Sequence, residues 1–298
     1  MYRIIDGILF EGKTSADTFD VRLWERNGHR EISARPVVQW TEVCMPRPEA
    51  LYVADPEVDA AYLEEKRIKN LKRAAMRAKT QCRRFIKAHG LDEMLTLTYR
   101  DNQTDERLFK EHFAKWVRRM KAALGGDFVY CAGFEPQDRG AWHAHVACHK
   151  LPKHVMHKGV KIEAWKLGTR IWRDVVGPTV DGKDGGLCFV GGKPKWGKRR
   201  QRMSVGKNAA YVSKYIVKHF DLMPEGKNRY SRSNGDVVGK PVTVRMQGKT
   251  MAEVIADAFM CFPGEVVLSH RVGRFGDSWY LATEPMIDLP EISGEGAL

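Results

Sequence analysis

The 298-residue sequence lacks several features that define large classes of proteins. Its six cysteines are scattered and form no CxxC pair, so neither a disulfide framework nor a cysteine zinc site can be read from it. No stretch approaches 18 apolar residues, and Arg3 and Asp6 interrupt the N-terminal apolar run before it could serve as a signal sequence. We therefore expect reduced thiols, no membrane partner and a location in the cytoplasm.

Acidic residues are too few to balance the basic ones. The sequence has 50 Lys and Arg against 37 Asp and Glu, which gives a net charge of +13. With 43% apolar and 29% charged residues it can still bury a core, which excludes a disordered basic tail. Between Lys66 and Lys87, ten of 22 residues are basic and none is acidic. This stretch indicates an acidic partner such as nucleic acid, with a solvated surface helix as the alternative.

Hydrophobic periodicity predicts an α+β fold. Residues 94–100 alternate as in a strand, residues 106–124 repeat as in a helix, and two further strands surround the turn-rich sequence PQDRG. The order β-α-β-β-α-β-α predicts a ferredoxin- or RRM-like antiparallel sheet flanked by helices, with five strands in all. The predicted divisions are an N-terminal arm or small β region (1–55), a basic helix (56–90), the core domain (91–222) and a C-terminal α/β extension (223–298).

A His-Ala-His pattern is the strongest local feature. His143 and His145 alternate on one strand and so project from the same face, about 6 to 7 Å apart. If Gly140 is left-handed in a three-residue hairpin loop, Glu135 lies directly opposite His143. Two imidazoles and a carboxylate suit Mg²⁺ or Mn²⁺. Taken alone, the pattern equally describes two semi-buried histidines.

A second pattern, Tyr211-Val-Ser-Lys214-Tyr215-Ile-Val-Lys218, lies on a predicted helix. The two tyrosines are four residues apart and therefore share a face, and each is followed by a lysine three residues later. Two phenols can then serve one site. The alternative is an amphipathic helix whose tyrosines simply pack against the core.

A third pattern, Leu95-Thr96-Leu97-Thr98-Tyr99, precedes the other two. Together, in this order, the three patterns resemble the motifs of HUH endonucleases that initiate rolling-circle replication, and the doubled tyrosine is similar to the two-tyrosine initiators of phages and plasmids. The resemblance covers about residues 90–222. It implies an HUH sheet, a divalent cation (Mg²⁺ or Mn²⁺) held by His143, His145 and Glu135, and a metal-dependent endonuclease and ligase that nicks single-stranded DNA.

The resemblance also implies roles for the remaining residues. Tyr211 and Tyr215 would form 5′-phosphotyrosine links in turn, and Lys214 and Lys218 would each assist the tyrosine three residues earlier. A basic segment between the last strand and the tyrosine helix, with a tryptophan among its cations, is expected to hold DNA together with the basic helix, and a solvated surface loop is the alternative. These expected DNA contacts are Lys193, Lys195, Trp196, Lys198, Arg199, Arg200 and Arg202, and Lys72, Arg73 and Arg77.

The motifs that are present and those that are incomplete indicate which partners to expect. The resemblance implies single-stranded or hairpin origin DNA as the substrate, in the cytoplasm of a bacterial host. Two GxxxxGK segments lack the Ser or Thr that would bind Mg²⁺, so no nucleoside triphosphate is expected, and a host helicase and DNA polymerase would complete replication. Two alternatives stay open: a two-tyrosine HUH transposase, and a non-catalytic nucleic-acid-binding protein with an RRM-like sheet.

Overall fold

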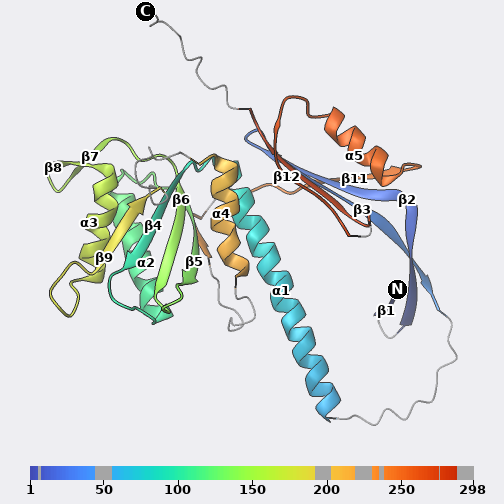
Figure 1. Cartoon of the computed structure of the whole chain (residues 1–298), viewed down its shortest axis with the longest axis horizontal. Helices are drawn as coiled ribbons and strands as arrows, with labels where there is room; N and C mark the ends of the chain where they lie inside the picture. Colours follow the sequence, from blue (N-terminus) through green and yellow to red (C-terminus); the bar gives the residue numbers. More distant parts are fainter. Residues whose placement is uncertain are drawn as a thin grey trace, which may run out of the picture. The chain divides into compact units, whose positions relative to one another are not determined.

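A computed structural model describes residues 1–5, 8–43, 56–191, 203–218, 230–234, 238–274 and 276–286. The chain forms two compact units (Figure 1). The central unit is continuous and spans Asp55–Val238. The terminal unit combines both ends of the chain, Met1–Ala54 and Gly239–Leu298. Within the described ranges, no helix is both long and apolar enough to cross a membrane.

The central unit contains a five-stranded antiparallel sheet, which confirms the predicted α+β class. The strand order is β10-β5-β6-β4-β9. The strands are β4 (Glu93–Tyr99), β5 (Tyr130–Pro136), β6 (Trp142–Cys148), β9 (Gly186–Val190) and β10 (Tyr230–Arg232). The helices are α1 (Pro56–Ala88), α2 (Glu106–Ala123), α3 (Ala164–Val176) and α4 (Val205–Val217), and a separate hairpin consists of β7 (His154–His157) and β8 (Val160–Glu163).

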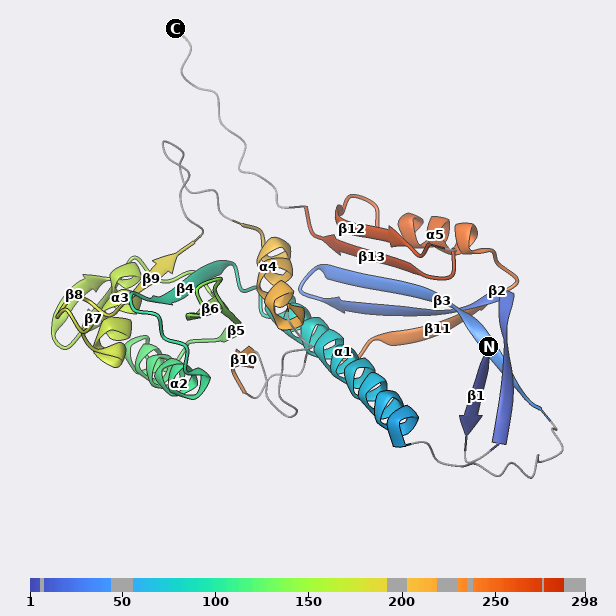
Figure 2. The same ribbon diagram turned by 60° about the horizontal axis from the view of Figure 1, so that its bottom comes forward.

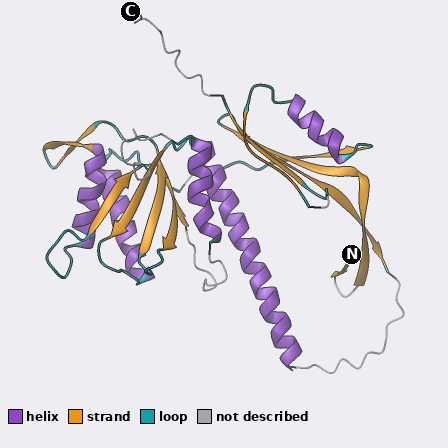
Figure 3. Ribbon diagram, in the orientation of Figure 1, coloured by secondary structure: helices purple, strands orange, loops and turns teal. Residues whose placement is uncertain are grey.

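Helices cover both faces of this sheet (Figures 1 and 3). The helices α2 and α3 pack on one face, whereas α4 packs on the other, with α1 against it. The strand pleat explains the division, because successive side chains point to opposite faces. Along β5, Tyr130 and Phe134 join the core under α2, while Gly133 lies against Val212 of α4. The same pleat directs Glu135 to the α4 side.

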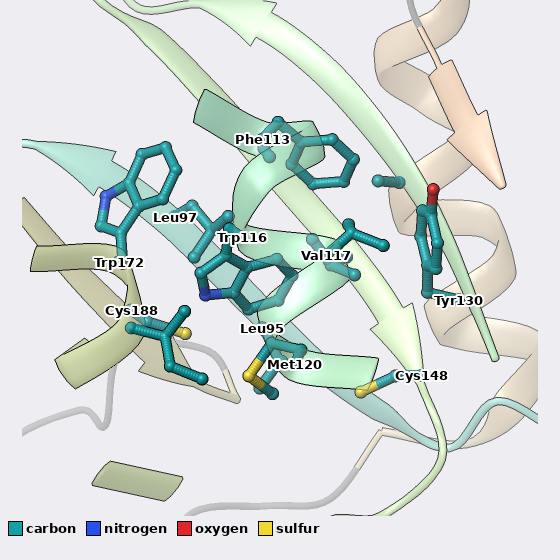
Figure 4. Packing of buried hydrophobic residues seen from close by; sticks show 14 of the residues in the cluster. Leu95, Leu97, Phe113, Trp116, Val117, Met120, Tyr130, Cys148, Trp172 and Cys188 are labelled. Atoms are coloured by element: carbon teal, nitrogen blue, oxygen red, sulfur yellow. The ribbon is translucent and has the colours of Figure 1, made fainter. Parts of the chain in front are cut away.

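An aromatic core joins the sheet to α2 and α3 (Figure 4). In α2, Phe113, Trp116 and Met120 recur at helical spacing and are buried. The buried indole N–H groups find acceptors: Trp116 Nε1 donates to the carbonyl of Gly168 at 3.1 Å, and Trp172 Nε1 donates to that of Thr98 at 2.9 Å. Truncating such an aromatic side chain to alanine costs about 3–5 kcal/mol. This core holds β4, β5 and β6 in fixed register.

The basic helix α1 ends where the sequence predicts. Gly90 adopts a φ of +61°, and the amide of Leu91 donates to the carbonyl of Ile86 at 3.0 Å, which closes the helix in a glycine-based cap. The last turns of α1 bury Cys82, Phe85 and Ile86. Earlier turns are largely exposed. The helix is therefore anchored at its C-terminal end.

The position of the fifth strand in the chain was not predicted. The sequence suggests a loose stretch near residues 225–236, but Tyr230–Arg232 pairs with β5 at the sheet edge. The amide of Ser233 donates to the carbonyl of Tyr130 at 3.0 Å, and the Tyr130 amide donates to Ser233 Oγ at 3.0 Å. A three-residue strand is too short to show alternation, so these long-range bonds define it.

The terminal unit is a six-stranded antiparallel sheet with one helix, α5 (Met251–Met260). Its strands are β1 (Tyr2–Ile5), β2 (Ile8–Arg26), β3 (His29–Glu42), β11 (Val242–Gln247), β12 (Val266–Val272) and β13 (Trp279–Glu284). Asn27 and Gly28, both with positive φ, form the tight turn between β2 and β3. From the sequence, residues 1–55 and 223–298 are expected to be separate regions; in the structure β3 pairs with β13, and β2 pairs with β11.

The charge of the sequence is divided unequally between the units. Asp55–Val238 contains 38 Lys and Arg against 21 Asp and Glu, a net charge of +17. The rest of the chain contains 12 basic and 16 acidic residues, a net charge of −4. The basic surplus therefore belongs to the central unit.

The cysteines form no cross-link in the described ranges. Four of them, Cys82, Cys131, Cys148 and Cys188, are buried free thiols, and Cys261 is an exposed free thiol.

Candidate active site

The hairpin of β5 and β6 has the register that the sequence predicts. Glu135 lies directly opposite His143. Gly140 has a φ of +85°, and the amide of Gln137 donates to the carbonyl of Ala141 at 2.8 Å, which closes the loop. His143 and His145 are both buried, and their ring centroids lie 6.5 Å apart. The hairpin thus brings both imidazoles and one carboxylate to the same face of the sheet.

His145 is the centre of this group. Its Nε2 lies 3.3 Å from Oε1 of Glu135, and its Nδ1 lies 3.3 Å from Oγ1 of Thr96. Thr96 is directly opposite His145 on β4. The sequence pattern marks the strand that contains Thr96 but indicates no role for this residue; the alternation of β4 places its side chain on the face of the histidines. Both ring nitrogens of His145 therefore have polar neighbours.

The tyrosine helix lies over the same imidazole. The ring of Tyr215 stacks on that of His145, with centroids 4.3 Å apart and planes at 16°. Tyr211 meets His145 edge-on at 5.4 Å, and the two tyrosine rings are 5.2 Å apart. Tyr215 is buried, with 7% of its surface exposed, whereas Tyr211 is half-buried. The spacing of four residues thus places both phenols beside one histidine.

Two local features bring α4 to this position. The side chain of Ser204 accepts a hydrogen bond from the amide of Lys207 and caps the start of the helix. Gly133, on β5, allows close approach, because a Cβ atom there would lie 2.7 Å from the carbonyl oxygen of Val212. No sequence pattern singles out Gly133, since nothing local marks the strand position that a distant helix will touch.

The two lysines, each expected from the sequence to assist the tyrosine three residues earlier, contact different groups of the site. Lys218 Nζ lies 3.3 Å from Oε2 of Glu135, and Lys214 Nζ lies 5.7 Å from the ring centre of Tyr215. The reason is that α4 ends at Val217, and Lys218 has an extended backbone, so helical spacing no longer directs its side chain. Lys218 is therefore placed at the carboxylate.

Two pKa values reflect this environment. Burial acts to raise the pKa of Glu135, but hydrogen bonds and charge from His145 and then Lys218 outweigh it and lower the pKa below the ordinary value. Burial raises the pKa of Tyr215, and its hydrogen bond with Tyr211 and the negative charge of Glu135 raise it further. From the sequence, neighbouring ammonium groups are expected to favour the phenolate; at Tyr215 burial dominates, so this phenol is neutral.

The donor set suits a divalent cation in chemical type, since it contains two imidazoles and a carboxylate on one face. In the arrangement described, Glu135 is instead engaged by His145 and Lys218. Among the described residues, no group of three or more His, Cys, Asp or Glu side chains is arranged so that it could hold a metal ion. A cation bound at Glu135 would compete with the contacts that Lys218 and His145 make with this carboxylate.

The predicted DNA contacts are only partly described. Lys72, Arg73 and Arg77 are exposed on α1, which packs against α4 on the tyrosine side of the sheet (Figure 2). The other expected contacts, Lys193, Lys195, Trp196, Lys198, Arg199, Arg200 and Arg202, lie outside the described residues. The cations of α1 therefore belong to the same unit as the tyrosines and to the same side of its sheet.

Comparison with known proteins finds a family match within the central unit. Residues 92–220 match the model of a family of replication-associated proteins, described by the name ORF2. The matched segment runs from the start of β4 to just beyond α4, and it includes Thr96, Glu135, both histidines and both tyrosines, but less than half of the chain. No curated protein and no solved structure matches. The similarity of residues 92–220 to replication-associated proteins supports a replication initiator.

Proposed function

We propose that the chain is a site-specific endonuclease and ligase for single-stranded DNA, which initiates and terminates rolling-circle replication. The observation that carries the proposal is the convergence of Tyr211 and Tyr215 on His145, beside Glu135 and Lys218. Two phenol nucleophiles next to a buried imidazole and carboxylate form an arrangement suited to phosphoryl transfer. The family match over the same residues favours this function.

In the proposed reaction, a tyrosine phenol oxygen attacks the phosphorus of one phosphodiester. The bond from phosphorus to the 3′ oxygen breaks, a 5′-phosphotyrosine forms, and the phenol proton is balanced by the proton that the released 3′-hydroxyl gains. The free 3′-hydroxyl can be extended by a host polymerase. The phosphotyrosine keeps the energy of the phosphodiester, so ligation remains possible. After the origin is regenerated, the second tyrosine cleaves it, and the 3′-hydroxyl released by this cleavage attacks the first phosphotyrosine. The tyrosine leaves and a closed DNA circle forms.

The proposal includes a divalent cation, Mg²⁺ or Mn²⁺, with His143, His145 and Glu135 as its ligands. Such an ion, when bound, neutralises charge on the phosphate and helps to orient it. The residues of the chain have their own tasks: Glu135 and Thr96 hold the His145 ring in place, and that ring supports Tyr215. The ammonium group of Lys214 lies 5.7 Å from the ring centre of Tyr215, and that of Lys218 lies beside Glu135; in the proposal both stabilise a tyrosyl phosphate.

The charge distribution supports single-stranded or hairpin origin DNA as the substrate. The net charge of +17 lies in the unit that holds the tyrosines, and Lys72, Arg73 and Arg77 are exposed on the helix packed against α4. Binding to phosphates releases counterions, so affinity should fall steeply as salt rises. In this proposal a host helicase separates the strands.

The test is covalent capture. Purified protein is incubated with Mn²⁺ and labelled single-stranded oligonucleotides that together cover the replicon encoding it. The products are then denatured and examined for label that is covalently attached to the protein. We expect an adduct with wild type and none with the Tyr211→Phe/Tyr215→Phe double variant. Binding without an adduct would overturn the endonuclease and favour a non-catalytic nucleic-acid-binding protein. An adduct formed only at the ends of a mobile element, and at no replication origin, would favour a transposase.

A further inference from the structure

We propose that Thr96 is a positioning residue for His145: its hydroxyl fixes the orientation of the imidazole, so that Nε2 and not a ring carbon faces Glu135. The effect of Thr96 on metal binding rests on the proposed function, in which His145 is a metal ligand. Thr96 lies directly opposite His145 in the pairing of β4 with β6, and Oγ1 of Thr96 is 3.3 Å from Nδ1 of His145.

The two cross-strand neighbours of His145 differ in what they can contribute. On one side, Gly133 of β5 is directly opposite His145 and has no side chain. Its missing Cβ is required for the approach of α4. On the other side, Thr96 supplies a hydroxyl from a β-branched side chain, whose χ1 angle is restricted. The orienting contact at Nδ1 therefore comes from β4.

The remaining contacts of the ring do not replace this one. Tyr215 stacks on the face of the imidazole and Tyr211 lies nearly perpendicular to it, so both restrict the tilt of the ring. Neither contact distinguishes the ring nitrogens from the ring carbons, because a 180° turn about the bond to Cβ exchanges Nδ1 with Cδ2 and Nε2 with Cε1 and still presents a similar face to Tyr215. The polar contacts with Thr96 and Glu135 select one of the two orientations.

A hydroxyl suits this position because it can donate or accept a hydrogen bond. When Nε2–H of His145 donates to the Glu135 carboxylate, the lone pair of Nδ1 accepts from the Thr96 hydroxyl. When Nε2 instead offers its lone pair to a cation, the proton is on Nδ1 and donates to Oγ1 of Thr96. The same side chain thus satisfies the ring in both states. Partners of this kind behind a metal-binding histidine typically change metal affinity by about 10–100-fold when removed.

Four proteins test the inference: wild type, Thr96→Val, Thr96→Ser and Thr98→Val. Valine keeps the branched shape of threonine without the hydroxyl, and serine keeps the hydroxyl without the branch. Thr98 lies two residues further along β4 on the same face. Replacing it removes a hydroxyl from the same strand while leaving the contact between Thr96 and His145, so it is the matched control. Thermal melts establish that each variant is folded.

The first readout is binding of Mn²⁺ alone, followed by isothermal titration calorimetry. We expect Thr96→Val to weaken binding about 10–100-fold, and Thr96→Ser and Thr98→Val to keep an affinity close to that of wild type. The inference would be overturned if wild type and Thr96→Val bound Mn²⁺ with equal affinity, or if Thr98→Val lost as much Mn²⁺ affinity as Thr96→Val.

The second readout needs no metal. Side-chain ¹⁵N spectra of metal-free protein, with His145 assigned from a His145→Gln variant, report which ring nitrogen carries the proton. We expect one defined pattern in wild type and Thr96→Ser and a mixed pattern in Thr96→Val; an unchanged pattern in Thr96→Val contradicts the inference. If wild type binds no Mn²⁺, the metal site of the proposed function fails, while these spectra still decide the role of Thr96.

Discussion

Tyr215 stacks face to face on His145 at 4.3 Å, whereas the ring of Tyr211 is nearly perpendicular to the same imidazole, with the centroids 5.4 Å apart. Tyr215 is also the more buried of the two, and burial raises its pKa. The two phenols therefore differ in burial and in how they contact His145, although the sequence presents them as equivalent repeats.

This asymmetry predicts an order of action. We expect Tyr211→Phe to lower formation of the first covalent adduct by a factor of about 10³ or more, because it removes the accessible nucleophile. We expect Tyr215→Phe to form the first adduct but to release no closed circle. The measurement is an adduct and circularisation assay on one oligonucleotide with two origin sites. The reverse pattern would assign the first attack to Tyr215.

The ion pair between Lys218 and Glu135 predicts competition with a cation. Lys218→Met removes a positive charge that lies 3.3 Å from Oε2 of Glu135. We expect Mn²⁺ to bind severalfold more tightly, while the rate of adduct formation falls by roughly 10²-fold because a phosphate-stabilising ammonium is lost. Lys214→Met is the matched control, since it makes the same charge change one turn earlier on an exposed residue. Equal effects on Mn²⁺ affinity in both variants would exclude direct competition at Glu135.

Gly133 predicts a link between packing and activity. In Gly133→Ala the new Cβ would lie 2.7 Å from the carbonyl oxygen of Val212, so α4 must move away from β5. We expect a loss of about 1–3 kcal/mol in the free energy of unfolding, measured with urea, together with a fall in adduct formation. Gly182→Ala is the control, because Gly182 has a φ of +74° with open space around it. It should cost stability through backbone strain and leave adduct formation unchanged; a similar loss of activity in both would argue against the role of Gly133.

The basic face of α1 predicts salt-sensitive DNA binding. Reversing the charges of Arg73 and Arg77, both exposed on α1, should weaken binding of single-stranded DNA. The dependence of log K on log salt concentration should become shallower by roughly 0.7 for each phosphate that is no longer neutralised. Fluorescence anisotropy over a salt series measures both effects. Arg271→Glu, an exposed change in the terminal unit, is the comparison. If it weakens binding as much as the α1 changes do, the effect is one of net charge alone.

The division into two units predicts an independent central fragment. Residues 55–238 have their own core and a net charge of +17, so we expect the fragment to fold with a cooperative melt and to bind single-stranded DNA. Circular dichroism and anisotropy test this. A fragment without a cooperative transition would mean that the terminal unit is needed for the fold.

Much of the local structure follows from the sequence alone. Alternation in residues 94–100, the glycine that closes the hairpin and the helical spacing of the tyrosines each depend on neighbours within a few residues. The register that sets Glu135 opposite His143 follows from loop length and the position of Gly140, and the structure has this register. The convergence of two histidines and a carboxylate on one face could therefore be predicted, because period-two geometry needs no information from distant parts of the chain.

What only the tertiary structure decided depends on contacts between distant segments. The stacking of Tyr215 on His145, the contact of Thr96 with the same ring, the pairing of Lys218 with Glu135 and the addition of β10 to the sheet each join residues that no local pattern relates. Likewise β3 and β13 come from opposite ends of the chain and pair in one sheet. Such contacts arise because a buried face must be covered and a strand edge paired, and the sequence specifies their partners only through the fold as a whole.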